Sequence, residues 1–270
     1  MHTGEKMRHI KFVKMTGAGN DFILIDNRSA KIEDRSSFGL DACNRKMSIG
    51  ADGVAFIEKR INPGSAFMMR LINADGSEAD MCGNAVRCIA FLGYKMGLAG
   101  RKLAVDTPAG IKRIFIESAE KVTVNMGLPS DLRLNIRLTA GRKNYNACHV
   151  NTGVPHAIVY ENSPDVENTG REIRFHKVFG KQGANANFVK VLGKRRLKVR
   201  TYERGVEAET LACGTGATAA ALISNMLGKT EFPTTVVTSG GQLLRIDIDK
   251  EGFLFMSGGV KMICEGTLYY

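Results

Sequence analysis

The chain has 270 residues, of which 44% are hydrophobic and 24% are charged. This length and composition indicate one large or two ordinary globular domains in a soluble protein. No apolar run approaches the length of a membrane span, so we expect no membrane partner. The first residues, MHTGEKMRHIKF, lack the apolar segment and cleavage site of a signal peptide. We therefore expect a cytoplasmic protein in which residues 1–8 form a short leader.

The formal net charge of +11 raises the question of an anionic partner. The only tight basic cluster, 194–196, follows a glycine and is typical of a hairpin turn. The chain has no tryptophan, and no basic stripe contains interleaved aromatic residues. We expect no nucleic-acid binding, although a basic protein would attract a small anionic substrate.

Short apolar runs separated by Gly, Asn or charged turns predict strands, mostly in antiparallel hairpins. In chain order the predicted strands are 10–15, 22–26, 54–58, 67–73, 103–106, 111–117, 121–126, 157–160, 187–191, 197–202, 235–238, 243–248, 253–256 and 260–264.

Two segments, 83–96 and 214–227, instead show helical spacing of apolar and small residues, which predicts buried helices. Each helix follows a Cys-Gly pair, so the two halves of the chain form a pseudo-repeat. We predict an α+β fold with two pseudo-symmetric domains, 9–127 and 128–259, with residues 260–270 crossing back to the first. Each domain would be a mostly antiparallel sheet or barrel wrapped around its central helix.

The six cysteines are too sparse in so long a chain to indicate a disulfide framework. Cys82 and Cys88 do not have the spacing of a zinc site, and we predict no metal. A buried cysteine is usually a small hydrophobic residue. Cys82 and Cys213, however, each lie at a predicted helix N-terminus, which lowers the pKa of a thiol, and each precedes a glycine that lets a ligand approach.

The segment from Gly214 to Ala219 formally matches the G-x-G-x-x-A fingerprint of a dinucleotide-binding fold. That fingerprint directly follows a strand, whereas here a long polar loop separates Tyr202 from Gly214. The glycines instead offer N–H groups at a helix start, which suit a carboxylate. Two thiols on opposite faces of an α-carbon can invert it without a cofactor, one as base and one as acid.

The sequence resembles the diaminopimelate epimerase family over nearly its whole length. The stretches that carry the resemblance are Gly17-Ala-Gly-Asn20-Asp-Phe, Gly50-Ala-Asp-Gly53, Asn73-Ala-Asp-Gly-Ser-Glu, Cys82-Gly-Asn84, Asn151-Thr-Gly-Val-Pro-His156, Asn185-Ala-Asn-Phe188, Glu203-Arg204-Gly and Leu211-Ala-Cys213-Gly-Thr215-Gly.

The resemblance implies interconversion of LL- and meso-diaminopimelate for lysine and peptidoglycan precursors, in the cytoplasm, by a homodimer, with neither pyridoxal phosphate nor metal. It implies that Cys82 and Cys213 are the acid and base. The implied substrate-binding residues are Asn20, Asn73, Gly83, Asn84, Asn185, Glu203, Arg204, Gly214 and Thr215, with Arg204 gripping the distal carboxylate. His156 and Glu203 would modulate the pKa values of the thiols.

Three positions depart from the family pattern. Val154 stands where many relatives have the Asn of Asn-Pro-His, and Gly53 stands where some have Gln. Cys264 lies where some relatives carry a dimer-interface tyrosine. We expect these differences to alter binding of the distal end and the dimer rather than the chemistry.

Three other functions compete with this interpretation. A proline or hydroxyproline racemase shares the two-thiol logic, but its first motif typically reads Cys-Gly-His where this chain has Asn84. A cysteine hydrolase would use one cysteine with a histidine such as His156. A nucleic-acid binder would show steeply salt-dependent association.

Overall fold

A computed structural model describes residues 8–270, so the leader expected at 1–8 lies, apart from Arg8, outside the described residues. The chain divides into two compact units. One ends at Val122 and takes in Gly259–Tyr270, and the other is Thr123–Gly258. The division therefore falls five residues before the end of the predicted first domain. The C-terminal strand β18 (Val260–Tyr269) pairs antiparallel with the first strand, β1 (His9–Gly17).

The first unit is built mainly from strands joined in one continuous order. β1 pairs antiparallel with β2, β2 parallel with β3, β3 antiparallel with β4, β4 parallel with β6, and β6 antiparallel with β7. The short strand β5 is added to β4. The bounds are β2 (Asn20–Asp26), β3 (Gly53–Glu58), β4 (Phe67–Asn73), β5 (Glu78–Ala79), β6 (Lys102–Asp106) and β7 (Lys112–Ile116).

The second unit repeats this sequence of pairings. β10 pairs antiparallel with β11, β11 parallel with β12, β12 antiparallel with β13, β13 parallel with β15, and β15 antiparallel with β16, while β14 is added to β13. The strands are β8 (Val122–Gly127), β9 (Ser130–Ala140), β10 (Lys143–Asn151), β11 (Pro155–Tyr160), β12 (Asn185–Gly193), β13 (Arg196–Glu203), β14 (Ala208–Thr210), β15 (Thr234–Val237), β16 (Leu243–Ile248) and β17 (Leu254–Gly258).

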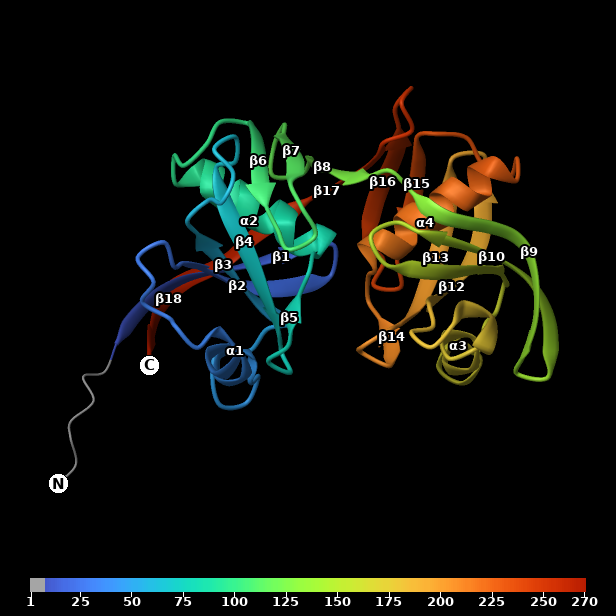
Figure 1. Cartoon of the computed structure of the whole chain (residues 1–270), viewed down its shortest axis with the longest axis horizontal. Helices are drawn as coiled ribbons and strands as arrows, with labels where there is room; N and C mark the ends of the chain where they lie inside the picture. The colour runs from blue at the N-terminus through green and yellow to red at the C-terminus, as the bar shows by residue number, and fades with distance from the viewer. Residues whose placement is uncertain (1–7) are drawn as a thin grey trace. The chain divides into compact units, whose positions relative to one another are not determined.

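The predicted central helices are present in both units (Figure 1). Helix α2 (Gly83–Lys95) contacts β1, β2, β3, β4, β6, β7 and β18. Helix α4 (Gly214–Met226) contacts β10, β11, β12, β13, β15, β16 and β17. Both helices carry apolar or small side chains on nearly every face. Such helices must be buried on all sides, and here strands enclose them. The predicted α+β fold with two repeated domains is confirmed.

Each unit also contains a second α-helix that was not predicted. Helix α1 (Arg35–Cys43) lies between β2 and β3, and α3 (Val166–Arg174) lies between β11 and β12. Parallel neighbours need a crossover connection, and these helices supply it in the two units. Both are nine residues long and begin at an aspartate N-cap, Asp34 and Asp165.

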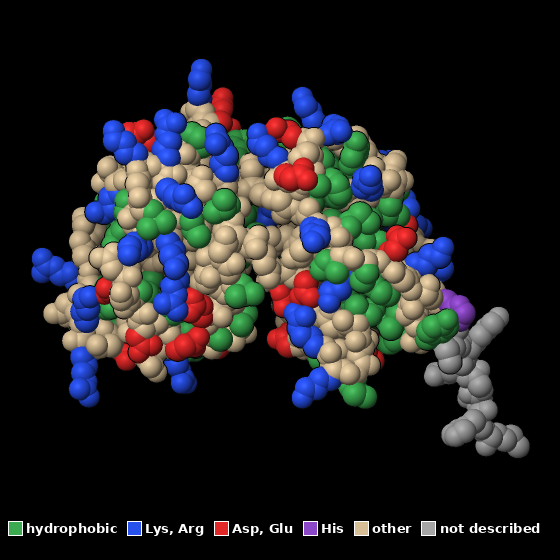
Figure 2. Space-filling view, turned by 180° about the vertical axis from the view of Figure 1, so that it is seen from behind, with side chains coloured by type: hydrophobic (Ala, Val, Ile, Leu, Met, Phe, Trp, Pro, Cys, Tyr) green, Lys and Arg blue, Asp and Glu red, His purple; other side chains and the backbone are tan. Residues whose placement is uncertain are grey.

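The long hairpin of β9 and β10 was not predicted, because most β9 side chains are exposed and the pair lacks a continuous apolar run. Figure 2 shows Lys and Arg side chains scattered over the visible face rather than gathered in one patch. Within residues 8–270, no helix is both long and apolar enough to cross a membrane.

Candidate active site

Cys82 is the N-cap residue of α2 and has an extended backbone, with φ −133° and ψ 122°. The N–H groups that open the helix, beginning at Gly83 and Asn84, therefore have no intrahelical partners. Together with the positive end of the helix dipole they favour an anion at this position. Cys82 is half-buried, so its thiol lies at the edge of the enclosed helix rather than within the core.

A row of hydrogen bonds fixes the amides beside Cys82. Asn84 accepts a hydrogen bond from Arg87 Nη2 (2.7 Å) and donates through Nδ2 to Asn20 Oδ1 (2.7 Å). Asn20 in turn donates through Nδ2 to Asp52 Oδ2 (3.0 Å). Because Arg87 can only donate and the Asp52 carboxylate can only accept, both amide orientations are set. Each amide keeps one N–H for a substrate oxygen.

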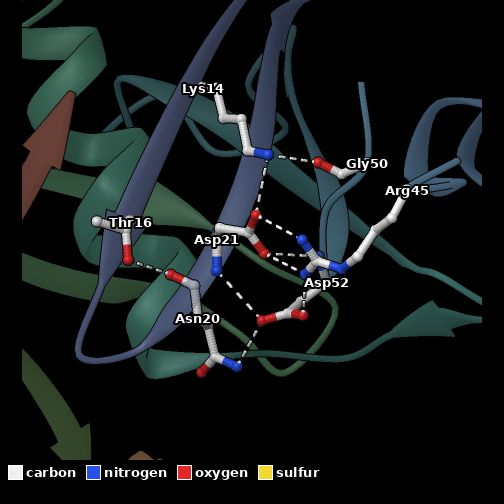
Figure 3. Close-up of polar contacts among 7 residues, drawn as sticks. All are labelled: Lys14, Thr16, Asn20, Asp21, Arg45, Gly50 and Asp52. Atoms are coloured by element: carbon white, nitrogen blue, oxygen red, sulfur yellow. Dashed lines mark hydrogen bonds and ion pairs between the residues drawn. The ribbon is translucent and has the colours of Figure 1, made fainter. Parts of the chain in front are cut away.

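Charged residues hold Asp52 beside Asn20 (Figure 3). Arg45 Nη2 lies 2.7 Å from Asp21 Oδ1 and 2.8 Å from Asp52 Oδ1. Lys14 Nζ approaches Asp21 Oδ2 to 3.0 Å. Burial alone would raise the pKa of Asp21, but the hydrogen bonds from Arg45 and Lys14 outweigh burial and keep that pKa below its ordinary value. The Asn20 side chain is thus supported by Asp52, which Arg45 links to Asp21 and Lys14.

Asn73 lies at the end of β4, opposite Gly53 of β3 in the strand register. Its Nδ2 donates to Ser77 Oγ (3.0 Å). Within residues 8–270 no hydrogen bond joins Asn73 to Asn20 or Asn84. A Cβ on Gly53 would stand 2.8 Å from the carbonyl oxygen of Ile72, so position 53 takes no side chain without a backbone shift.

Cys213 is the N-cap residue of α4, again with an extended backbone (φ −118°, ψ 108°). Its Sγ accepts the Gly216 N–H at 3.4 Å and lies 3.4 Å from Thr215 Oγ1. Thr152 Oγ1 donates to the Thr215 carbonyl oxygen (2.9 Å). The Asn151–His156 stretch therefore contacts the start of the helix headed by the second cysteine.

A buried polar network lies under this helix start. Asn187 Oδ1 accepts from Thr201 Oγ1 (2.9 Å), so its Nδ2 is the donor to His156 Nδ1 (3.1 Å). The His156 proton is thereby placed on Nε2, which has no hydrogen-bond partner among residues 8–270. Burial, with smaller effects from His149 and Arg204, lowers the pKa of His156 to about 3, and the ring is neutral.

The remaining predicted residues of the second unit surround Asn185. Its Nδ2 donates to the Pro155 carbonyl oxygen (3.0 Å), and its Oδ1 accepts the Arg204 N–H (2.8 Å). The Arg204 guanidinium contacts Gln182 Oε1 at 3.3 Å. Glu203 Oε2 accepts from Thr210 Oγ1 (2.7 Å). Asn185 thus acts on Arg204 through the backbone and keeps one side-chain N–H for a ligand.

The family model described as diaminopimelate epimerase matches residues 12–132 and 148–263 of this chain. The chain belongs to the diaminopimelate epimerase family. A diaminopimelate epimerase of Aquifex aeolicus is 39% identical, with 96% of this chain and 98% of that protein covered. A diaminopimelate epimerase of Archaeoglobus fulgidus is 41% identical, with 96% of each covered. The family resemblance identified in the sequence is confirmed.

Solved structures share the fold of this diaminopimelate epimerase family member at low sequence identity. A phenazine biosynthesis protein of the PhzF family from Bacillus anthracis has a TM-score of 0.75 and 15% identity, covering 97% of this chain and 99% of its own. A hydroxyproline epimerase from Agrobacterium vitis has a TM-score of 0.69 and 11% identity, covering 97% of this chain and 93% of its own. These likenesses establish the two-unit architecture.

Sequence reasoning missed Asp52, Arg87 and Asn187 as residues that support the family's motifs. Asp52 lies inside the quoted stretch Gly50–Gly53, and Asn187 inside Asn185–Phe188. Both lie within the quoted motifs, but nothing in a linear pattern indicates which amide the Asp52 carboxylate or the buried Asn187 side chain contacts. Arg87 reads as an ordinary helix residue until its complete burial is seen.

Proposed function

We propose that the chain interconverts LL- and meso-diaminopimelate with Cys82 and Cys213 as a two-base pair, without a cofactor. The observation that carries this proposal is that each repeated unit caps its enclosed helix with a cysteine. A single base would return a proton to the face it came from, whereas inversion needs a base on one face and an acid on the other. One thiolate removes the α-proton, and the other thiol delivers a proton to the opposite face.

The developing negative charge next to the α-carboxylate requires electrostatic stabilisation. We assign this to the N–H groups of Gly83 and Asn84 on α2 and of Gly214 and Thr215 on α4. Helix starts suit an anion because these donors lack intrahelical partners and the dipole is positive there. Asn84 adds its remaining side-chain N–H.

The same proposal gives further binding of the substrate to Asn20, Asn73, Asn185, Glu203 and Arg204. Arg204 would bind the distal carboxylate in a bidentate manner, in place of its contact with Gln182. Asn185 supports this role because it fixes the Arg204 backbone. Glu203 would pair with the distal ammonium group.

His156 and Glu203 would tune the second thiol. With a pKa of about 3, His156 is uncharged at neutral pH, so it would act through its Nε2–H and not as a cation. We further propose that the enzyme works in the cytoplasm and that it is a homodimer. Sedimentation of the purified chain tests the homodimer.

The decisive test is LL-diaminopimelate in deuterated water. We expect solvent deuterium at the α-carbon and formation of the meso isomer by the wild type. Cys82→Ser and Cys213→Ser should each slow full epimerisation severely, while Cys148→Ala, at a buried position of β10, serves as the cysteine control. Full activity in either of the first two variants would remove the two-base assignment.

Two further assays separate the rivals. A proline or hydroxyproline racemase would incorporate deuterium into proline or hydroxyproline instead of diaminopimelate. In a cysteine hydrolase, loss of Cys82 and loss of Cys213 would have very unequal effects.

A further inference from the structure

Arg87 carries a charge in the interior of the first unit. Its side chain is 0% exposed. Nε donates to the Gly83 carbonyl oxygen (3.1 Å), Nη2 to Asn84 Oδ1 (2.7 Å) and Nη1 to the Gly259 carbonyl oxygen (3.3 Å). All three acceptors are neutral, and no carboxylate within residues 8–270 forms an ion pair with this guanidinium.

Two physical effects disfavour a cation at this place. A buried charge without a partner of opposite sign loses its hydration without compensation. The guanidinium is also folded back onto the first turn of α2, where the helix dipole repels positive charge. A negative charge near the start of α2 would relieve both effects.

The charged groups of β1 and β2, and Asp52 beside them, do not supply that negative charge. Lys14 and Asp21, on β1 and β2, are paired with each other, and Asp52 reaches Arg87 only through the amides of Asn20 and Asn84. The thiols of Cys88 and Cys82, which lie on the same helix and at its head, are acidic groups whose charge acts on the guanidinium.

Cys88 cannot be the anion, because complete burial raises its pKa to about 12. Cys82, half-buried at the head of the helix, directly precedes Gly83, whose carbonyl oxygen accepts from Arg87 Nε.

The second unit has no cation in the equivalent position. Thr218 follows Cys213 by five residues, as Arg87 follows Cys82, and its Oγ1 donates to the Gly214 carbonyl oxygen (2.9 Å) in the way that Arg87 Nε donates to Gly83. Cys213 Sγ contacts the Thr215 hydroxyl and the Gly216 N–H. At the equivalent position of the first turn, the first unit therefore carries a buried cation, Arg87, and the second a neutral hydroxyl, Thr218.

We propose that Arg87 is a positioning residue whose buried charge holds the resting negative charge of the thiol pair on Cys82 and leaves Cys213 protonated. This inference rests on the proposed two-base reaction. In the first turnover the Cys82 thiolate takes the α-proton and becomes a thiol. Cys213 gives its proton to the opposite face and becomes a thiolate. Exchange of one proton with solvent at each sulfur then restores the resting state.

The test is site-resolved alkylation, because iodoacetamide reacts with the thiolate and not with the thiol. The purified full chain is alkylated across a range of pH, and the rate at each cysteine is read by peptide mass spectrometry. In the wild type we expect the midpoint for Cys82 to lie below that for Cys213. In Arg87→Met the Cys82 midpoint should rise by about one pH unit or more, since a neighbouring cation shifts an acid by that order.

Matched variants separate charge from packing. Arg87→Lys keeps the charge and should retain most of the low Cys82 midpoint. Lys95→Met removes one positive charge from the exposed end of the same helix and should leave the midpoint unchanged. N-acetylcysteine added to every sample is the reference thiol.

A Cys82 midpoint that is unchanged in folded Arg87→Met would overturn the proposal, because a purely structural role predicts that result. If that variant fails to fold, the test is the alkylation of the wild-type protein. A midpoint pH for Cys213 that is equal to or below that for Cys82 would overturn the proposal. Failure of the proposed function is a separate outcome, seen as wild-type protein that does not exchange deuterium into diaminopimelate.

Discussion

A methyl group on Gly216 would stand 2.3 Å from the amide oxygen of Asn187, so the start of α4 and this asparagine can occupy their positions only because residue 216 has no side chain. The strand registers place the pair Asn187 and Thr201 where the first unit has Ala55 and Leu71. There a small apolar side chain replaces the asparagine. The equivalent helix position, three residues after the cysteine, is alanine (Ala85).

We predict that Gly216→Ala displaces either Asn187 or the first turn of α4. Overpacking of this kind costs about 1–3 kcal/mol of unfolding free energy. Epimerase activity should also fall, because the helix start to which we assign the substrate carboxylate moves. Denaturant unfolding and kcat measure the two effects. Gly193→Ala adds a methyl group with no atom nearby and should change neither the unfolding free energy nor kcat.

The double variant Gly216→Ala with Asn187→Ala imitates the first unit. It should regain part of the lost stability but none of the activity, because His156 then has no donor at Nδ1. Recovery of activity in the double variant would show that Asn187 is not needed for the site.

Asp52→Ala tests the support of Asn20. The Asn20 amide would lose its charged acceptor, and hydrogen bonds to charged groups are worth about 1.5–3 kcal/mol, so kcat/KM should fall about tenfold or more. Unfolding free energy should change by less than about 1 kcal/mol, since the ion pair with Arg45 is largely at the surface.

Glu78→Ala is the matched control for this variant. Its carboxylate is 41% exposed and paired with Arg70, compared with 40% for Asp52, but it lies outside the Asn20 network. Equal losses of kcat/KM in the two variants would mean that Asp52 acts only through surface charge.

Gly53→Gln tests whether the amide found in some relatives can be restored. Because a Cβ at position 53 meets the Ile72 carbonyl oxygen at 2.8 Å, the β3–β4 pair must shift. We expect a loss of about 1–3 kcal/mol in stability and no improvement in KM. Gly64→Ala, with nothing near its added methyl group, is the control. A lower KM with unchanged stability would contradict this account.

The sequence was sufficient for the features that depend on pattern. Apolar and small residues around the whole of 83–96 and 214–227 predicted two enclosed helices, and the Cys-Gly pair before each predicted the repeat. The crossover helices α1 and α3 were missed because nine polar-rich residues carry little periodicity. Their formation follows from the parallel pairing of the strands that they connect, which is a tertiary property.

The site shows the same division between pattern and tertiary context. The family motifs named Asn20 and Asn84, and the structure joins them by a hydrogen bond of 2.7 Å. The difference between the two helix starts could not be predicted, because Arg87 and Thr218 acquire meaning only when both prove to be buried and bonded to the same carbonyl position.

Enclosure of His156 makes a further prediction about acid stability. In the folded chain its pKa is lowered from 6.5 to about 3 by burial, with smaller effects from His149 and Arg204. Between these two pH values the unfolded chain binds a proton at His156 but the native state does not. The contribution of His156 to the unfolding free energy is therefore complete above pH 6.5 and is lost as the pH falls toward 3. The slope contributed by this one group approaches about 1.4 kcal/mol per pH unit.

On acidification from about pH 7 to about pH 5, the unfolding free energy of His156→Gln should therefore fall less than that of the wild type. This holds even if the variant is less stable at about pH 7 because the hydrogen bond to Asn187 is altered. Denaturant unfolding at a series of pH values gives the two slopes. His9→Gln, at an exposed histidine of β1, should follow the wild type. A parallel pH dependence in wild type and His156→Gln would show that His156 takes up a proton as readily in the native state as in the unfolded chain, and would contradict the lowered pKa.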